Sequence, residues 1–262
     1  MRRLLNPLAL AACVWLGAAA TAAAVDFEWI GQLAPGQRIE VIGLNGSIQA
    51  TDARGGGNVI VTAVKTAGRR GDPSEVRVEM VSHAGGVTVC VVYPAPEGRA
   101  ANECRPGGGG QNNSRDNDTR VDFTVQVPAG VGLTARNVNG SIEAQGLQSD
   151  IEATTVNGSV TLSTAGSARA TTVNGSINAA MGQAAWPNGA KFTTVNGAVT
   201  LRLPAAVNAD VRVSTVSGGI SSDFPLQVST DPGPKHAEGI IGGGGQRLDV
   251  TTVNGQVNLL RN

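Results

Sequence analysis

The chain has 262 residues, with 20 basic and 20 acidic side chains and therefore a formal net charge of zero. Without residues 1–24, which contain Arg2, Arg3 and no acid, 18 basic residues remain against the 20 acids. This balance excludes the positive surface that nucleic acids and anionic lipids require, and an aromatic content of 3% excludes base-stacking platforms or rows of sugar-stacking rings. The 36 glycines and alternating valines indicate short strands joined by tight turns.

Residues 1–24 have the pattern of a secretory signal peptide. Two arginines precede a largely apolar run over residues 4–20, and three alanines at 22–24 offer a small-residue cleavage site. We expect cleavage after Ala24 and export of the mature chain. A lipoprotein box ending at Cys13 is the competing interpretation, and the apolar run that continues beyond Cys13 disfavours it. No later stretch approaches the roughly 20 apolar residues of a spanning helix, so we expect no transmembrane segment after signal removal.

The mature chain contains two cysteines, Cys90 and Cys104. Two thiols in an exported protein predict one structural disulfide. It would close a loop of about 15 residues, for which the loop-entropy model gives roughly 3 kcal/mol of stabilisation. A redox pair is disfavoured, because the spacing is not Cys-x-x-Cys and no βαβ pattern surrounds it.

Residues 25–130 are predicted to form an N-terminal β region. Alternating patterns predict strands over 38–42, 58–65, 75–81, 87–93 and 121–127, with a hairpin turn at 83–86. A polar, Gly-rich loop follows Cys104. Its oxygen-bearing side chains could bind calcium, but their spacing matches neither an EF-hand nor a Gly-rich calcium repeat, so we expect no metal site and no cofactor. These side chains are Asn112, Asn113, Asp116, Asp118 and Asp122.

Residues 131–262 are predicted to form a β-repeat stack. The phrase TTVNGSV at 154–160 recurs with small changes, and its turn glycines are 18, 17, 22, 21 and 37 residues apart. A period near 20 residues is typical of stacked supersecondary units, and the long last interval indicates an insertion within 223–246. The predicted turn residues, including a distant copy at 42–48, are Asn45, Gly46, Asn139, Gly140, Asn157, Gly158, Asn174, Gly175, Asn196, Gly197, Ser217, Gly218, Asn254 and Gly255.

Each repeat has a physical interpretation. Asn-Gly favours positive φ and thus a sharp turn, and we expect the Val before it and the Val or Ile two residues after the Gly to point into a shared interior. Coils stacked in register would place the Asn side chains above one another, so that their amides form a hydrogen-bonded ladder. A meander of hairpins with Asn-Gly at each tip is the alternative. Identical residues at equivalent positions favour the stack.

The sequence therefore predicts an all-β fold: a β-solenoid-like stack of short strands with Asn-Gly turns, preceded by an antiparallel β region. A stack has two open ends that would aggregate if left bare. We expect residues 25–130 to cover one end. Arg261 and Asn262 lie almost at the other end, so we expect that edge to be short, charged or covered by residues 223–246. Trp186, in an extended coil, is expected to fold back over the stack rather than to protrude as a binding anchor.

The TTVNGSV phrase, the run VDFTVQVPAGV at 121–131 and the segment GIIGGGGQRLDVTTVNGQVNL at 239–259 resemble one bacterial family. It is the putative-adhesin or toast-rack β-strand-repeat family, a domain of unknown function, and the resemblance spans roughly residues 37–259. It implies a β-solenoid-like domain in the cell envelope. It supplies no catalytic residues.

Catalytic patterns are missing from the sequence. The mature chain has two histidines, His83 and His236, and shows no nucleophile elbow, no His-Glu-x-x-His and no Cys–His arrangement. The acids in the repeats, such as Glu152 and Asp210, are isolated. We therefore expect a non-enzymatic protein.

The leading hypothesis is an exported structural or adhesin-like interaction module in the periplasm or at the cell surface. It would contact an unidentified macromolecular envelope partner through its Thr/Asn/Ser face or its loops. A soluble periplasmic binding or sensing module that uses residues 105–120 and 223–246 is the first alternative. A carbohydrate-active enzyme with Glu152 or Asp210 as a catalytic acid is the second.

Overall fold

The computed structural model describes residues 25–108, 116–182, 186–229 and 233–262. The predicted signal peptide with its cleavage after Ala24, the alternative at Cys13, and Asn112 and Asn113 lie outside the described residues. Helical structure in the described ranges is limited to two 3-10 turns, Pro73–Glu75 and Pro106–Gly108. The protein is therefore built almost entirely from β-strands.

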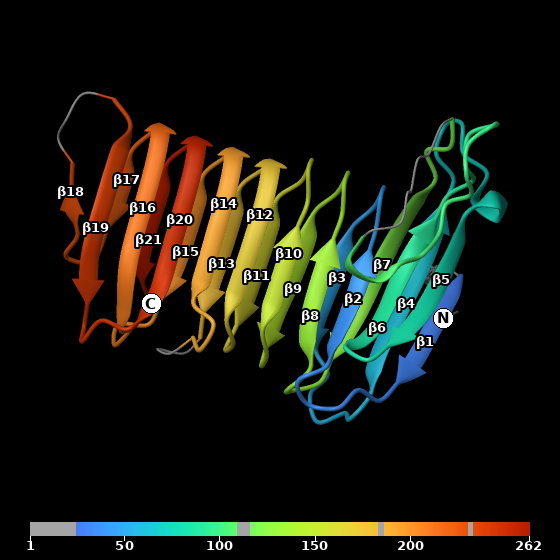
Figure 1. The fold of residues 1–262 in the computed structure, drawn as a ribbon, viewed down its shortest axis with the longest axis horizontal. Coiled ribbons are helices and arrows are strands. Elements are labelled where there is room, and N and C mark those ends of the chain that lie inside the picture. The colour runs from blue at the N-terminus through green and yellow to red at the C-terminus, as the bar shows by residue number, and fades with distance from the viewer. Residues whose placement is uncertain (1–24, 109–115, 183–185, 230–232) are drawn as a thin grey trace, which may run out of the picture.

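The strands form two long sheets that both run along the molecule, and side chains of both contribute to one hydrophobic core (Figure 1). Sheet A has ten strands, in spatial order β1 (Phe27–Gly31), β4 (Val59–Thr66), β7 (Arg120–Val127), β3 (Ile48–Asp52), β9 (Ile142–Leu147), β11 (Val160–Thr164), β13 (Ile177–Met181), β15 (Val199–Leu203), β21 (Val257–Arg261) and β17 (Ile220–Ser222). Sheet B has eleven, in the order β18 (Gln227–Val228), β19 (Lys235–Ile241), β16 (Ala209–Ser217), β20 (Gln246–Asn254), β14 (Ala190–Asn196), β12 (Ala168–Asn174), β10 (Ile151–Thr154), β8 (Gly132–Arg136), β2 (Arg38–Ile42), β6 (Gly86–Val92) and β5 (Arg77–His83).

Each repeat is one coil of a solenoid-like stack. A coil supplies one strand to sheet B, turns at its Asn-Gly corner, and supplies the next strand to sheet A. Neighbouring coils pair in parallel and in register, as β12 and β14 do. A meander of hairpins would give antiparallel neighbours, so the predicted all-β, β-solenoid-like stack is confirmed.

The order of the coils in space departs from their order in the sequence at both ends. The β2–β3 coil lies between β6–β7 and β8–β9, and the β20–β21 coil lies between β14–β15 and β16–β17. Arg261 and Asn262 lie almost at the open end, as expected, because β21 is the second strand from that end of sheet A and only the three-residue β17 lies beyond it. The repeats are too similar to one another for their sequences to reveal which coils are neighbours.

Antiparallel strands close both ends of the stack. At one end β1 pairs with β4, β4 with β7, and β5 with β6; at the other, β19 pairs with β16 and β18 with β19 (Figure 1). Residues 25–130 and 223–246 thus cover the two ends as expected. Of the predicted strands, 75–81 is displaced to β5, because Pro73–Glu75 forms a 3-10 turn with Asp72 as its N-cap.

The core contains the Val or Ile that follows six of the seven turn glycines by two residues, whereas Ile220, after Gly218, is partly buried. The six core side chains are at most 1% exposed: Ile48, Ile142, Val160, Ile177, Val199 and Val257. Trp186 is fully buried, so it folds into the stack and offers no protruding anchor.

Candidate functional site

The asparagines at the corners form a continuous amide ladder. Asn139 Nδ2 donates to Asn45 Oδ1 at 2.9 Å, and each later coil repeats the bond to its neighbour, ending with Asn254 to Asn196 at 2.8 Å. The remaining members are Asn157 and Asn174. Ser217 lies beside Asn254 rather than beside Asn196, because the last coil is inserted between them.

In most coils two further bonds hold the corner to its neighbours. The backbone N–H of Gly158 donates to the Asn174 carbonyl at 3.0 Å, and the Gly158 carbonyl accepts from the Thr172 hydroxyl at 2.8 Å. The equivalent hydroxyl bond to the corner carbonyl of a neighbouring coil is made by Thr155, Thr194, Thr215 and Thr252. The second Thr of the repeat therefore points inward and satisfies a corner carbonyl.

The predicted reason for glycine at the corners is wrong for most of the coils. Among the turn glycines only Gly46 and Gly140 have a positive φ below 160°. A Cβ on Gly158 would instead lie 2.2 Å from the Gly140 carbonyl oxygen, and one on Gly175 would lie 2.0 Å from that of Gly158. Glycine is required because the neighbouring coil occupies the space of a side chain.

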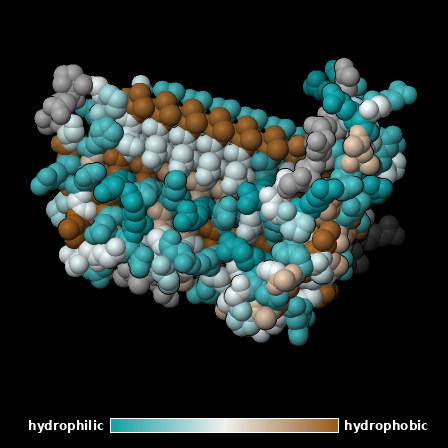
Figure 2. Space-filling model, viewed as in Figure 1, coloured by the Kyte–Doolittle hydropathy of each residue, from teal (hydrophilic) through white to brown (hydrophobic). Residues whose placement is uncertain are grey.

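The Val that precedes each Asn points to solvent, and the prediction that it lines the interior is wrong. Side chains alternate along a strand, so the inward Thr172 directs Val173 outward. The aligned residues form a row that we call the valine ridge, and Figure 2 shows it as a continuous apolar stripe along the stack. Val156, Val173 and Val195 are 36–38% exposed and Val216 is 54% exposed. The ridge consists of Leu44, Val138, Val156, Val173, Val195, Val253 and Val216.

A threonine row runs beside the valine ridge on the outer face of sheet B. It consists of Thr154, Thr171, Thr193, Thr251 and Ser214, which pair in register from β10 to β16. With strands about 4.8 Å apart, the ridge is about 30 Å long and the threonine row about 20 Å. Neither row contains a charged side chain, so together they form a narrow, uncharged band made mainly of valine and threonine.

A third row, next to the threonine row, carries charges of both signs: Glu152, Arg169, Lys191, Asp249, Arg212 and Glu238. Arg212 pairs with Glu238 at 3.6 Å, and Asp249 pairs with Arg247 at 2.9 Å. These pairs are exposed and contribute little to stability. The mixed signs leave no field that would attract a strongly charged polymer.

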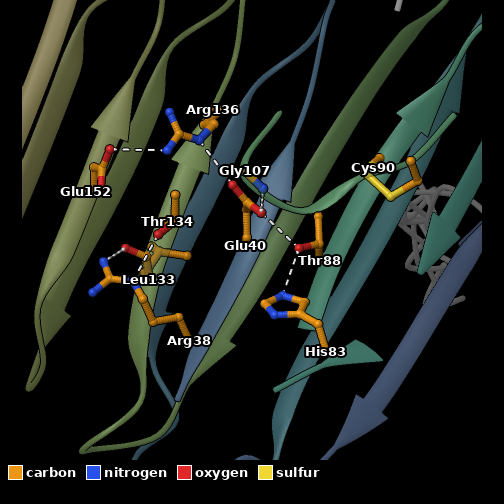
Figure 3. Close-up of polar contacts among 11 residues, drawn as sticks. Arg38, Glu40, His83, Thr88, Cys90, Gly107, Leu133, Thr134, Arg136 and Glu152 are labelled. Atoms are coloured by element: carbon orange, nitrogen blue, oxygen red, sulfur yellow. Dashed lines mark hydrogen bonds and ion pairs between the residues drawn. A yellow bond between two sulfur atoms is a disulfide. The ribbon is translucent and has the colours of Figure 1, made fainter. Parts of the chain in front are cut away.

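A polar network lies on sheet B where the N-terminal coils meet (Figure 3). Glu40 is buried, and its Oε1 accepts from Arg136 Nε at 3.1 Å. Its Oε2 accepts from the Thr88 hydroxyl and from the Gly107 backbone N–H, both at 2.8 Å. Cys90 and Cys104 are joined by a disulfide just beside this network. The carboxylate and the disulfide together fasten the segment after Cys104 to the sheet, which is a structural role.

His83 belongs to the same network. Because the Thr88 hydroxyl donates to Glu40, it accepts from His83 Nε2, 3.2 Å away, and His83 Nδ1 accepts the Gly85 N–H at 3.2 Å. Both ring nitrogens thus have hydrogen-bond partners within the protein.

Two of the predicted loop acids, Asp118 and Asp122, accept hydrogen bonds from the protein. The backbone N–H groups of Arg70 and Arg69 both bond the Asp118 carboxylate at 2.9 Å and lower its pKa. Partial burial raises the pKa of Asp122, but hydrogen bonds from Arg120 and Ser47 outweigh it and leave the pKa below its ordinary value. Among the described residues, no group of three or more His, Cys, Asp or Glu side chains is arranged to hold a metal ion.

The two acids proposed for glycan cleavage are not brought together. Glu152 is on β10 and pairs with Arg136 at 3.3 Å, whereas Asp210 is on β16, four strands away in sheet B and so roughly 20 Å distant. Paired glycosidase carboxylates lie within about 10 Å. Asp210 instead lines an open depression of about 750 Å³ together with Arg212, Glu238 and Arg247.

In the described ranges, no helix has the length and apolar character needed to cross a bilayer. None of the curated proteins is significantly similar to the chain. Three solved structures are similar to the chain at low identity. A putative cell adhesion protein from Clostridium sporogenes has 10% identity and a TM-score of 0.48, with 90% of this chain and 99% of that chain covered. A putative adhesin from Bacteroides fragilis has 10% identity and a TM-score of 0.36, with 89% and 96% covered. One from Parabacteroides merdae has 9% identity and a TM-score of 0.23, with 90% and 95% covered.

The family comparison is more decisive than these structural similarities. The model of the family described as Toastrack DUF4097 matches residues 45–260. The match begins at the first Asn-Gly corner and extends through the last coil of the repeat, so it covers both sheets. The chain belongs to the Toastrack DUF4097 family.

Proposed function

We propose that the chain is an exported, non-enzymatic protein of the cell envelope that acts as an adhesin-like interaction module. The observation that carries this proposal is the uncharged band on sheet B, made of the valine ridge and the threonine row. Contiguous apolar side chains on a solvent-exposed surface typically mark interaction sites. A stack held by in-register strands and an amide ladder keeps such a band rigid, so little conformational entropy is lost when it is covered.

Export is supported by two features. The Cys90–Cys104 disulfide is typical of oxidising compartments outside the cytoplasm. Residues 1–24 have the charge and hydropathy pattern of a cleaved signal. Both features agree with a role in the periplasm or on the cell surface.

Protease shaving of intact cells, with disrupted cells as the control, tests the proposal. We expect mass spectrometry to find peptides of this chain after shaving of intact cells. Release only after disruption would exclude the adhesin-like role. It would favour the periplasmic binding module, for which the depression beside Asp210, lined also by Pro225 and Gln227 of the 223–246 segment, is the candidate site.

A pair of surface variants tests which face makes the contact. Val173→Asp with Val195→Asp places two charges in the valine ridge, and we expect it to abolish cell–cell aggregation or surface attachment conferred by the protein. Thr161→Asp with Asn178→Asp is the matched control, because both positions lie on sheet A strands and point outward. Equal loss in both pairs would show that the band on sheet B is not the contact face.

A further inference from the structure

The chain contains seven Asn-Gly sequences, and this dipeptide can modify itself. The glycine backbone nitrogen loses its proton and attacks the Asn side-chain carbon, the bond to the amide nitrogen breaks, and ammonia leaves. Water then opens the resulting succinimide to aspartate or isoaspartate. Glycine makes the attack easy because it has no side chain and a freely adjustable backbone. The reaction therefore needs a glycine N–H that is free to ionise and a backbone that is free to bend.

Six of the seven sequences are in the ladder, where neighbouring coils hold both reacting groups. The glycine N–H donates to the main-chain carbonyl of the next coil at 2.8–3.0 Å, and the asparagine amides bond one another at 2.8–2.9 Å. Attack in any coil thus requires two coils to separate. These six asparagines are Asn45, Asn139, Asn157, Asn174, Asn196 and Asn254.

In the described part of the chain, the coil formed by β16 and β17, at the end of the stack, has neither the glycine hydrogen bond nor the asparagine. Within the described ranges the N–H of Gly218 has no hydrogen bond, and the residue before it is Ser217, which cannot deamidate. Every corner that has an asparagine also has a glycine N–H bound by the next coil.

Asn188–Gly189 is held differently. It lies in the turn between β13 and β14, outside the ladder, and its side chain is exposed. The Gly189 N–H donates to the Trp186 carbonyl at 2.8 Å, a bond within the same turn, and Asn188 Nδ2 donates to Asp150 Oδ2 at 2.9 Å. The Asn188 N–H also donates to the Ser167 hydroxyl at 3.1 Å, so two side chains of other coils hold the asparagine, whereas the glycine N–H is held within its own turn. Releasing both reacting groups requires opening this turn and breaking bonds to side chains, but no separation of paired strands.

We infer that Asn188 is the site of spontaneous deamidation in the folded protein, and that the six ladder asparagines react only when coils separate. The product replaces an amide donor by a carboxylate beside Asp150, so a hydrogen bond becomes a repulsion between like charges. The modified turn contains Trp186, which is fully buried. Deamidation at Asn188 is thus expected to loosen the cover over this part of the core. The inference does not depend on the proposed function.

Timed incubation at mildly alkaline pH tests the inference, with the native protein and a urea-unfolded sample in parallel. Peptide mapping that distinguishes isoaspartate follows each site. In urea we expect comparable rates at all seven sites. In the native protein we expect Asn188 to react first, with the ladder sites slowed by about 100-fold or more, as for groups that react only after local opening. Ladder sites that react as fast as Asn188, or an Asn188 that is as slow as the ladder, would overturn the inference.

Two variants sharpen the test. Asn188→Gln should remove the first acidic species, because glutamine cyclises far more slowly, and it leaves the ladder unchanged. Thr172→Val keeps the side-chain shape but removes the hydroxyl that bonds the Gly158 carbonyl. In this variant we expect the native rate at Asn157 to rise several-fold relative to Asn196, whose corner keeps its bond from Thr252. An unchanged ratio in a folded Thr172→Val protein would contradict control by the stack.

Discussion

Gly175 lies where the carbonyl oxygen of Gly158 approaches from the neighbouring coil, 2.0 Å from the site of a Cβ. Gly175→Ala therefore has to push two coils apart, and we expect it to lower the free energy of unfolding by about 2–4 kcal/mol, a large value for a surface substitution. Urea denaturation measures this loss. Gly219→Ala is the matched control, because nothing lies within 4 Å of its Cβ site, and it should cost less than about 0.5 kcal/mol.

Asp122 connects β7 to the first corner by accepting the Ser47 N–H at 2.8 Å and the Ser47 hydroxyl at 2.6 Å. Its pKa is lowered from 3.8, so its contribution to stability is present above that value and is lost as the pH falls through the lowered folded-state pKa. We expect Asp122→Asn to cost about 1 kcal/mol at pH 7, a modest loss for a partly exposed group, and less at a pH below 3.8. Urea midpoints at the two pH values check this, and a difference independent of pH would contradict it.

Residue patterns predicted which positions matter at a corner better than they predicted what each one does. The Thr-Thr-Val-Asn-Gly order marks the turn, yet Val173 is outside and Thr172 is inside. A hydrophobic residue is normally the better candidate for burial. The corner reverses this preference because a buried carbonyl of the adjacent coil needs a hydroxyl donor, and that need exists only after the coils are stacked.

At the scale of elements, the disulfide joins β6 to an irregular segment with no strand partner of its own. Cys90 and Cys104 are 14 residues apart, and for a loop of this size the entropy model gives about 3 kcal/mol. We therefore expect the double variant Cys90→Ser, Cys104→Ser to unfold at a clearly lower temperature than the oxidised protein. A reductant should lower the melting temperature of the native protein and leave that of the variant unchanged. A reductant effect on the variant would show that another process is being measured.

Strands with strict alternation were placed by sequence to within a residue or two. The 38–42 prediction coincides with β2, and the 121–127 prediction lies within β7. The displaced start of β5 has a local cause, since Asp72 caps a turn that begins at Pro73. Sequence periodicity reveals the alternation of side chains, but it does not reveal the capping hydrogen bond that makes β5 begin later than predicted.

At the scale of the whole molecule, the position of β20–β21 between two earlier coils predicts what happens when this last coil is removed. Removing residues 246–262 would leave β14 and β16 of sheet B without the strand that separates them. Unpaired parallel edges are templates for association, so we expect the truncated protein to form oligomers or aggregates in sedimentation experiments. The full chain at equal concentration is the control. A monomeric, folded truncation product would show that β14 and β16 can pair directly.

The period of the repeat predicted the stack but could not predict the order of its coils. Neighbouring coils recognise one another through Val, Thr, Asn and Gly at equivalent positions, and those residues are nearly the same in every coil. The distinguishing information lies outside the repeat, in the antiparallel strands β4, β5 and β19 that close the two ends. Their pairing determines which coils are terminal and therefore which gap the late coil must fill.

The position of β20–β21 inside the stack affects the order in which the coils can assemble. The chain emerges from the ribosome, and from any export channel, with β16–β19 ahead of β20–β21. During that interval β14 and β16 present matching Thr and corner residues to each other, so a premature pairing is available. The last coil must then either find the gap still open or displace the early pair. Completion of the stack is therefore a late event, expected to be slower than the addition of coils that follow one another in the sequence.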